Sequence, residues 1–67
     1  MDFNDFKCGI SSLILKSGGN LIARFSEDKE KGRYIARISD GTKIIGNAGS
    51  RSISVSWGSG HMAMASI

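Results

Sequence analysis

The sequence predicts a mainly β fold, a small antiparallel meander of four to five strands that forms a single domain over residues 1–67. Two observations predict this fold class. Apolar and polar residues alternate with a period of two in several short segments, as they do in strands that bury one face. Turns rich in glycine, asparagine and aspartate separate these segments, and turns of this kind join the strands of hairpins.

The N-terminal part is predicted to contain one short helical turn and then a hairpin. Asp2 precedes Phe3 and Phe6, which stand three residues apart, so Asp2 is expected to cap a helical turn. Residues 12–16, SLILK, are followed by SGGN and then by LIARFS at residues 21–26. Adjacent glycines accept positive φ at little cost, and this order therefore predicts two strands joined by a tight turn.

Two further strands are expected after the charged loop EDKEKG. In RYIARIS, residues 33–39, aromatic and aliphatic residues alternate with Arg33 and Arg37. The sequence DGT then predicts a second tight turn, which leads into KIIG at residues 43–46. These segments continue the predicted antiparallel meander.

The clearest alternation lies in RSISVSW, residues 51–57. Ile53, Val55 and Trp57 occupy every second position, and serines stand between them. This pattern predicts a strand with one face against the core and the other face in water.

The tail HMAMASI, residues 61–67, allows a strand or a short C-terminal helix. As a strand, it places Met62 and Met64 on one face. As a helix, it follows a GSG turn in which Ser59 serves as the N-cap, and alanine and methionine favour helix over strand. Composition therefore favours the helix, although seven residues form a stable helix only when they pack against something.

The composition is that of a soluble globular chain, with 40% apolar and 22% charged residues. No apolar run approaches the roughly 20 residues of a spanning helix, and the N-terminus does not resemble a signal peptide. A cytoplasmic location without a membrane partner is therefore expected. A chain of this size buries only about 60% of its unfolded surface. Because Cys8 and His61 are the only residues of their kinds, no internal disulfide or closed zinc site is available. A protein partner or a homo-oligomer is expected to cover what remains exposed.

No catalytic or cofactor-binding motif is recognised. The loop GNAGSRS, residues 46–52, lacks the Gly-Lys-Ser/Thr ending of a phosphate-binding loop. The GSG turn lacks the spacer residues of a nucleophile elbow. Ser59, Cys8, His61, Asp40 and Asp28 are the residue types that could act as nucleophiles, acids or bases, and no spacing among them indicates a catalytic set. The prediction is a protein that is not an enzyme and that holds neither a metal nor a cofactor.

The formal net charge of +3 suggests a second class of function. Arg24, Arg37, Lys43 and Arg51 could project from one polar face of the sheet and neutralise phosphates without reading sequence. A small basic β domain that binds nucleic acid is therefore the alternative hypothesis.

The order of strands and turns, ending in GSG and an alanine-containing segment, resembles the C-terminal half of proteasome-type subunits, the HslV-like N-terminal nucleophile family that includes phage-encoded relatives. The residues that carry this resemblance are Asp40, Gly41, Gly58, Ser59, Gly60, Ala63 and Ala65. It covers the chain from about Ile10 onward. The family's threonine nucleophile and its lysine have no counterpart in this chain, which opens MDFND. The resemblance therefore implies a noncatalytic assembly or inhibitory module that interacts with proteins, of the kind that a phage-derived fragment of such a subunit would provide.

Overall fold

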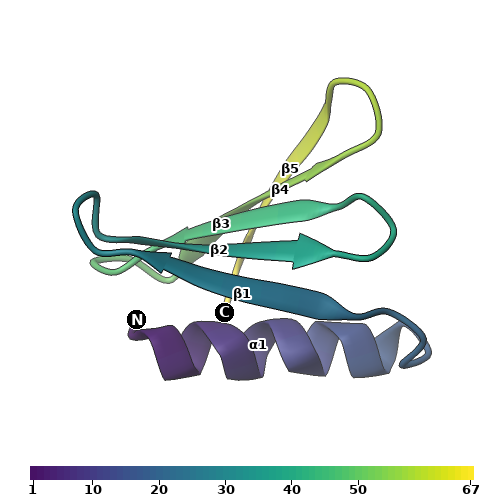
Figure 1. Cartoon of the computed structure of the whole chain (residues 1–67), viewed down its shortest axis with the longest axis horizontal. Coiled ribbons are helices and arrows are strands. Elements are labelled where there is room, and N and C mark those ends of the chain that lie inside the picture. Colours follow the sequence, from purple (N-terminus) through teal and green to yellow (C-terminus); the bar gives the residue numbers. More distant parts are fainter.

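One N-terminal helix is followed by five strands that pair with one another in chain order (Figure 1). The structure is a computed structural model and describes residues 1–67. The elements are α1 (Phe3–Lys16), β1 (Ala23–Asp28), β2 (Arg33–Ile38), β3 (Lys43–Asn47), β4 (Ser52–Trp57) and β5 (His61–Ser66). All four strand pairs are antiparallel, so the predicted mainly β meander is confirmed.

Helix α1 begins where the sequence predicts a helix start. The side chain of Asp2 accepts a hydrogen bond from the backbone N–H of Asp5 at 2.7 Å, which satisfies one of the free donors of the first turn. The helix then runs for 14 residues instead of one turn. It has neither the length nor the apolar character that a membrane-spanning helix needs.

The strand predicted over residues 12–16 is wrong, because this segment is the last part of α1. Phe6, Ile10 and Ile14 recur every four residues and pack toward the sheet, which is the spacing of one helical face. The glycines of SGGN end the helix instead of forming a hairpin turn. Both have positive φ, and the N–H of Gly19 bonds to the carbonyl of Ile14 at 3.0 Å.

The core lies between α1 and the face of the sheet that we call the inner face. Seven hydrophobic residues are buried there: Phe6, Ile10, Tyr34, Ala36, Ile38, Ile44 and Ile53. The ring of Phe6 lies 5.6 Å from that of Tyr34 and 6.1 Å, edge-on, from that of Phe25. A Cβ at Gly46 would come within 2.9 Å of the Phe6 ring. Gly46 therefore allows the helix to approach the sheet closely.

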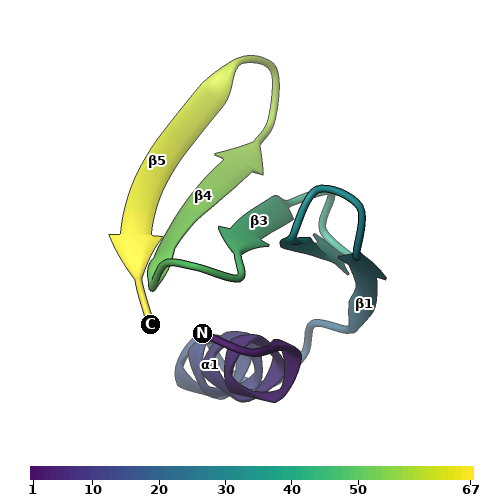
Figure 2. The same cartoon turned by 90° about the vertical axis from the view of Figure 1, so that its left-hand side faces the viewer.

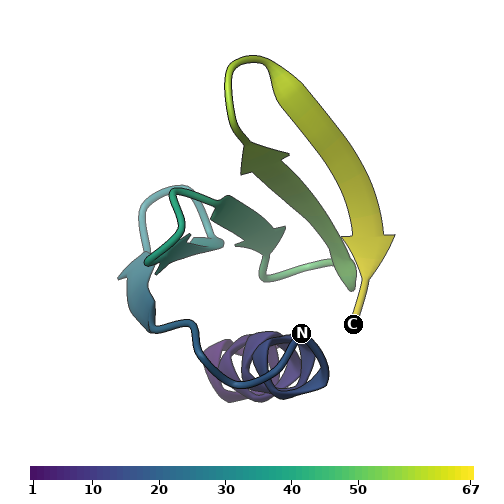
Figure 3. The ribbon, with the colours of Figure 1, turned by 90° about the vertical axis from the view of Figure 1, so that its right-hand side faces the viewer.

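The hairpin of β4 and β5 rises away from the helix, so α1 covers only part of the sheet (Figure 2, Figure 3). Gly58 and Gly60 have positive φ in the turn that joins the two strands, and Ser59 lies in this turn. The tail therefore forms a strand, and the C-terminal helix that composition favours is wrong. Pairing with β4 along all six residues of β5 outweighs the helix propensity of alanine and methionine.

Candidate functional site

Strand β5 is the least covered element of the sheet. All six of its residues are exposed, including Met62 at 73% and Met64 at 78%. It forms one edge of the sheet, and its turn end points away from α1, whereas Ile67, directly after the strand, packs against Gly9 of the helix (Figure 2). None of its side chains is an acid, a lysine or an arginine. Uncharged, exposed edge strands of this kind readily pair with another strand.

The hydrogen-bond alternation shows which backbone groups of β5 face outward. The N–H of Ile67 donates to the carbonyl of Arg51 at 2.9 Å, so this pair belongs to the hydrogen-bonded set of the β4–β5 ladder. Hydrogen-bonded and non-hydrogen-bonded pairs alternate in an antiparallel ladder. The N–H and C=O groups of Met62, Met64 and Ser66 therefore point away from β4, toward the free edge.

The opposite edge, β1, differs in charge. Three of its six residues are charged, namely Arg24, Glu27 and Asp28. Charges on an edge strand oppose pairing with another strand, because their desolvation is costly. Of the two edges, β5 is the one without this protection.

An apolar groove continues from the core toward β4. It has a volume of about 200 Å³ and lies between the C-terminal half of α1 and the ends of β2, β3 and β4. Leu13 and Val55 are among its lining residues, and Leu13 is 45% exposed. Farther along the same face, Trp57 is 43% exposed and stacks on His61, with ring centroids 5.9 Å apart. Val55 and Trp57 thus occupy successive inner-face positions of β4, between the groove and the β4–β5 turn.

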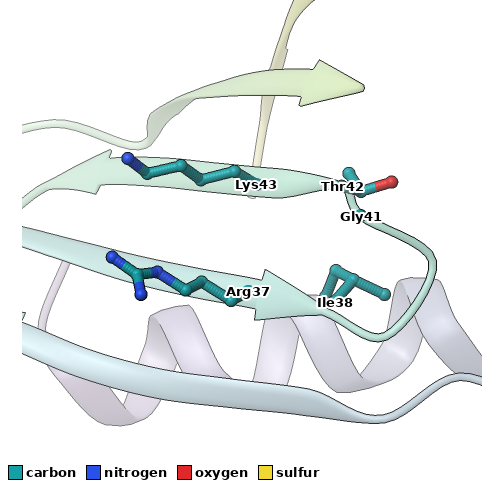
Figure 4. A pocket seen from close by; sticks show the side chains of 5 residues that line it. All are labelled: Arg37, Ile38, Gly41, Thr42 and Lys43. Atoms are coloured by element: carbon teal, nitrogen blue, oxygen red, sulfur yellow. The ribbon is translucent and has the colours of Figure 1, made fainter. Parts of the chain in front are cut away.

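Three of the four cations predicted to contact nucleic acid form one row on the outer face of the sheet. Arg24 lies directly opposite Arg37, and Arg37 lies directly opposite Lys43. All three side chains are exposed, and those of Arg37 and Lys43 extend side by side (Figure 4). We call Arg24, Arg37 and Lys43 the cation row.

Arg51 lies outside this row. It precedes β4 in the turn after β3, at the end of the sheet where Arg33 pairs with Asn47. Arg33 is on the same face and strand as Arg37, but it forms an ion pair with Asp28 at 3.6 Å. The row is therefore limited to three cations, and the third arginine on that face, Arg33, is paired with Asp28.

The candidate nucleophiles, acids and bases are dispersed. Cys8 is exposed on α1, Ser59 and His61 lie at the β4–β5 turn, and Asp28 pairs with Arg33. No group of three or more His, Cys, Asp or Glu residues could hold a metal ion.

The carboxyl group of Asp40 and the phenol of Tyr34 have shifted pKa values. The hydroxyl and the backbone N–H of Thr42 hydrogen-bond to Asp40 in the β2–β3 turn and hold the pKa of that carboxyl below its ordinary value. Burial raises the pKa of Tyr34, and the negative charges of Glu27, Asp2 and Asp5 raise it further. Neither Asp40 nor Tyr34 lies in β5.

The free edge of β5 is a site that the sequence did not predict, because residues 61–67 could form either a helix or a strand. The alternation of Met62 and Met64 with alanine was the one signal that could have indicated it. No protein-family model, curated protein or solved structure matches the chain, so the resemblance to proteasome-type subunits stays a prediction.

Proposed function

We propose that this protein is a noncatalytic assembly module that joins a second copy of itself through β5. The observation that carries the proposal is a six-residue edge strand that is exposed on both faces, uncharged, and free to pair along its outer edge. The dispersed positions of the candidate nucleophiles, acids and bases support the noncatalytic part.

The sequence of β5 suits antiparallel pairing with itself. A two-fold axis beside Met64 places Met64 opposite Met64 of the second copy and Met62 opposite Ser66 of the second copy. These are the residues whose backbone groups point outward, so the three pairs would form about six hydrogen bonds. Ala63 and Ala65 would lie on the other face, where their small side chains leave the two sheets room to join.

Charge favours a second copy over an unrelated strand of mixed charge. Because β5 carries no acid, lysine or arginine, self-pairing brings no like charges together. The Met64 side chains would meet on the outer face and lose much of their exposed surface, and methionine adapts readily to such contacts.

The expected association is weak. About six backbone hydrogen bonds at about 1 kcal/mol each, with about 3 kcal/mol from the burial of two methionines, give roughly 9 kcal/mol. Loss of translational and rotational freedom costs about 4 kcal/mol at the least. A net of about 5 kcal/mol corresponds to a dissociation constant near 0.2 mM.

Sedimentation velocity over about 10 μM to 1 mM tests the proposal, since this range brackets the expected constant. The mass of the wild-type protein should rise with concentration. The variant Met64→Pro removes one outward N–H without removing a bond to β4, and proline is tolerated at such edge positions. It should remain monomeric at concentrations where the matched control Met64→Ala, which keeps the N–H, still associates.

Met64→Lys provides a second variant in case proline perturbs the strand, because two lysines would then face each other across the axis. Circular dichroism and the fluorescence of Trp57 establish that each variant is folded. A wild-type protein that stays monomeric at about 1 mM would overturn the proposal. So would folded Met64→Pro and Met64→Lys variants that associate as the wild-type protein does.

A further inference from the structure

The geometry of the sheet places the three residues of the cation row close together. The N–H of Ser39 bonds to the carbonyl of Ile22, which makes Arg24 and Arg37 a hydrogen-bonded pair with Cα atoms about 5.5 Å apart. The N–H of Ile38 bonds to the carbonyl of Thr42, which makes Arg37 and Lys43 a non-hydrogen-bonded pair about 4.5 Å apart. Three positive charges therefore span roughly 10 Å of one face.

Nothing in the fold neutralises these charges. The only ion pair of the structure joins Arg33 to Asp28. Arg33 lies on β2, four residues before Arg37 and on the same face. Beyond Lys43 the row continues with Ser56 and then Met62, which are uncharged. Like charges placed directly opposite each other destabilise a sheet, so the row is unfavourable in the isolated protein and becomes favourable when an anion covers it.

Two shallow hollows flank Arg37. One has a volume of about 350 Å³ and is lined by Arg37, Lys43 and Thr42, among others. The other has a volume of about 320 Å³ and is lined by Arg24, Arg37 and Ser39, among others. Each hollow thus offers two cations, and Arg37 is shared between them. Repeated anions along a backbone fit two adjacent sites of this kind better than one isolated anion does.

We propose that the cation row binds the phosphate backbone of double-stranded nucleic acid without reading its sequence. The outer face presents no aromatic side chain on which a base could stack. Phe25, Tyr34 and Trp57 belong to the inner-face positions of their strands, and Phe3 and Phe6 belong to α1. Binding of single strands usually depends on such stacking, so the duplex is the better fit. This function uses β1–β3 and does not rest on pairing through β5.

Fluorescence anisotropy with a labelled DNA duplex of mixed sequence tests the proposal. Three phosphate contacts predict that log K falls with log salt with a slope of about −2.7. Arg37→Gln removes the central contact, so the slope should change to about −1.8 and the affinity should fall roughly eightfold at 0.1 M salt. The matched control is Arg33→Gln, on the same strand and face, which should leave the affinity within about twofold because Arg33 is paired with Asp28.

Three results would overturn the proposal. One is the absence of binding at about 20 mM salt, where phosphate contacts are strongest. Another is an equal loss of affinity for Arg37→Gln and Arg33→Gln, which would show that net charge and not the row is responsible. The third is binding that Arg37→Gln abolishes but that is tighter for vesicles of anionic phospholipid than for the duplex at equal phosphate, which would assign the row to a membrane surface.

Discussion

The close approach of α1 to the sheet at Gly46 gives a quantitative prediction for stability. A methyl group at position 46 would lie 2.9 Å from two ring atoms of Phe6 and 3.0 Å from the side chain of Met1. Contacts this short force the ring or the helix to move, and overpacking of this kind costs about 1–3 kcal/mol. A 67-residue domain has a total stability of only about 3–10 kcal/mol. Gly46→Ala should therefore lower the free energy of unfolding by a measurable share of its total.

A double-mutant cycle separates the clash from other effects of the substitution. Phe6→Leu removes the ring atoms that the new methyl group would meet, so Gly46→Ala should cost about 1–2 kcal/mol less in the Phe6→Leu protein than in the wild-type protein. The matched control is Gly49→Ala in the β3–β4 turn, where a Cβ would meet nothing within 4 Å. It should change stability by less than about 0.5 kcal/mol in both proteins.

The assay is urea unfolding at low protein concentration, followed by the fluorescence of Trp57, the only tryptophan. An equal cost of Gly46→Ala in the two proteins would refute the reasoning, because it would show that the Phe6 ring does not lie against position 46. A large cost of Gly49→Ala would equally show that the penalty is not specific to the helix contact.

Three further predictions concern single side chains. Asp2→Ala removes the N-cap bond to Asp5 and should cost about 1 kcal/mol in urea unfolding, whereas Asp2→Asn should cost less. Because Thr42 lowers the folded-state pKa of Asp40, the stability that this carboxylate contributes is present above its ordinary pKa and is lost as pH falls through the lowered value. Asp40→Asn should therefore weaken the acid dependence of the urea midpoint, and an unchanged dependence would exclude this origin. The folded-state pKa of Tyr34 is raised, so the stability that its neutral phenol contributes is present below pH 10 and is lost as pH rises through the raised value. Tyr34 is the only tyrosine, and its phenolate absorbance should therefore titrate at higher pH in the folded than in the urea-unfolded protein. Coincident titrations would contradict the burial of its ring.

The strands that bury one face against the core were predictable from the sequence. Strands β2 and β4 match the predicted residues 33–39 and 51–57 within one residue at each end, because the apolar residues that face the core alternate with mostly polar ones. β3 likewise starts at the predicted Lys43. The period of two records this difference directly.

The helix and the tail were not predictable in the same way. The glycines after Lys16 suit a hairpin turn and a helix C-terminus equally well, and the contiguous apolar run Leu13–Leu15 obscured the four-residue spacing of Phe6, Ile10 and Ile14. In the tail, local propensity favoured a helix and tertiary pairing with β4 overrode it.

The two candidate sites differ in what the sequence could indicate. Arg37 and Lys43 flank a short turn, so their juxtaposition follows from the hairpin, and Arg24 joins them through the register of β1. The prediction that Arg51 lies beside the other three cations is wrong, because Arg51 is in the β3–β4 turn at the other end of the sheet. The free edge of β5 depends on the order of all five strands, which no local pattern specifies.

Hydrogen exchange of the β5 amides tests the central claim most directly. The N–H groups of Ala63 and Ala65 face β4, whereas those of Met62, Met64 and Ser66 face outward. Of these five amides, those of Ala63 and Ala65 should be protected in a dilute sample, and near 1 mM the three outward amides should gain protection as copies pair. Outward amides that exchange at the same fast rate at both concentrations would contradict pairing through this edge.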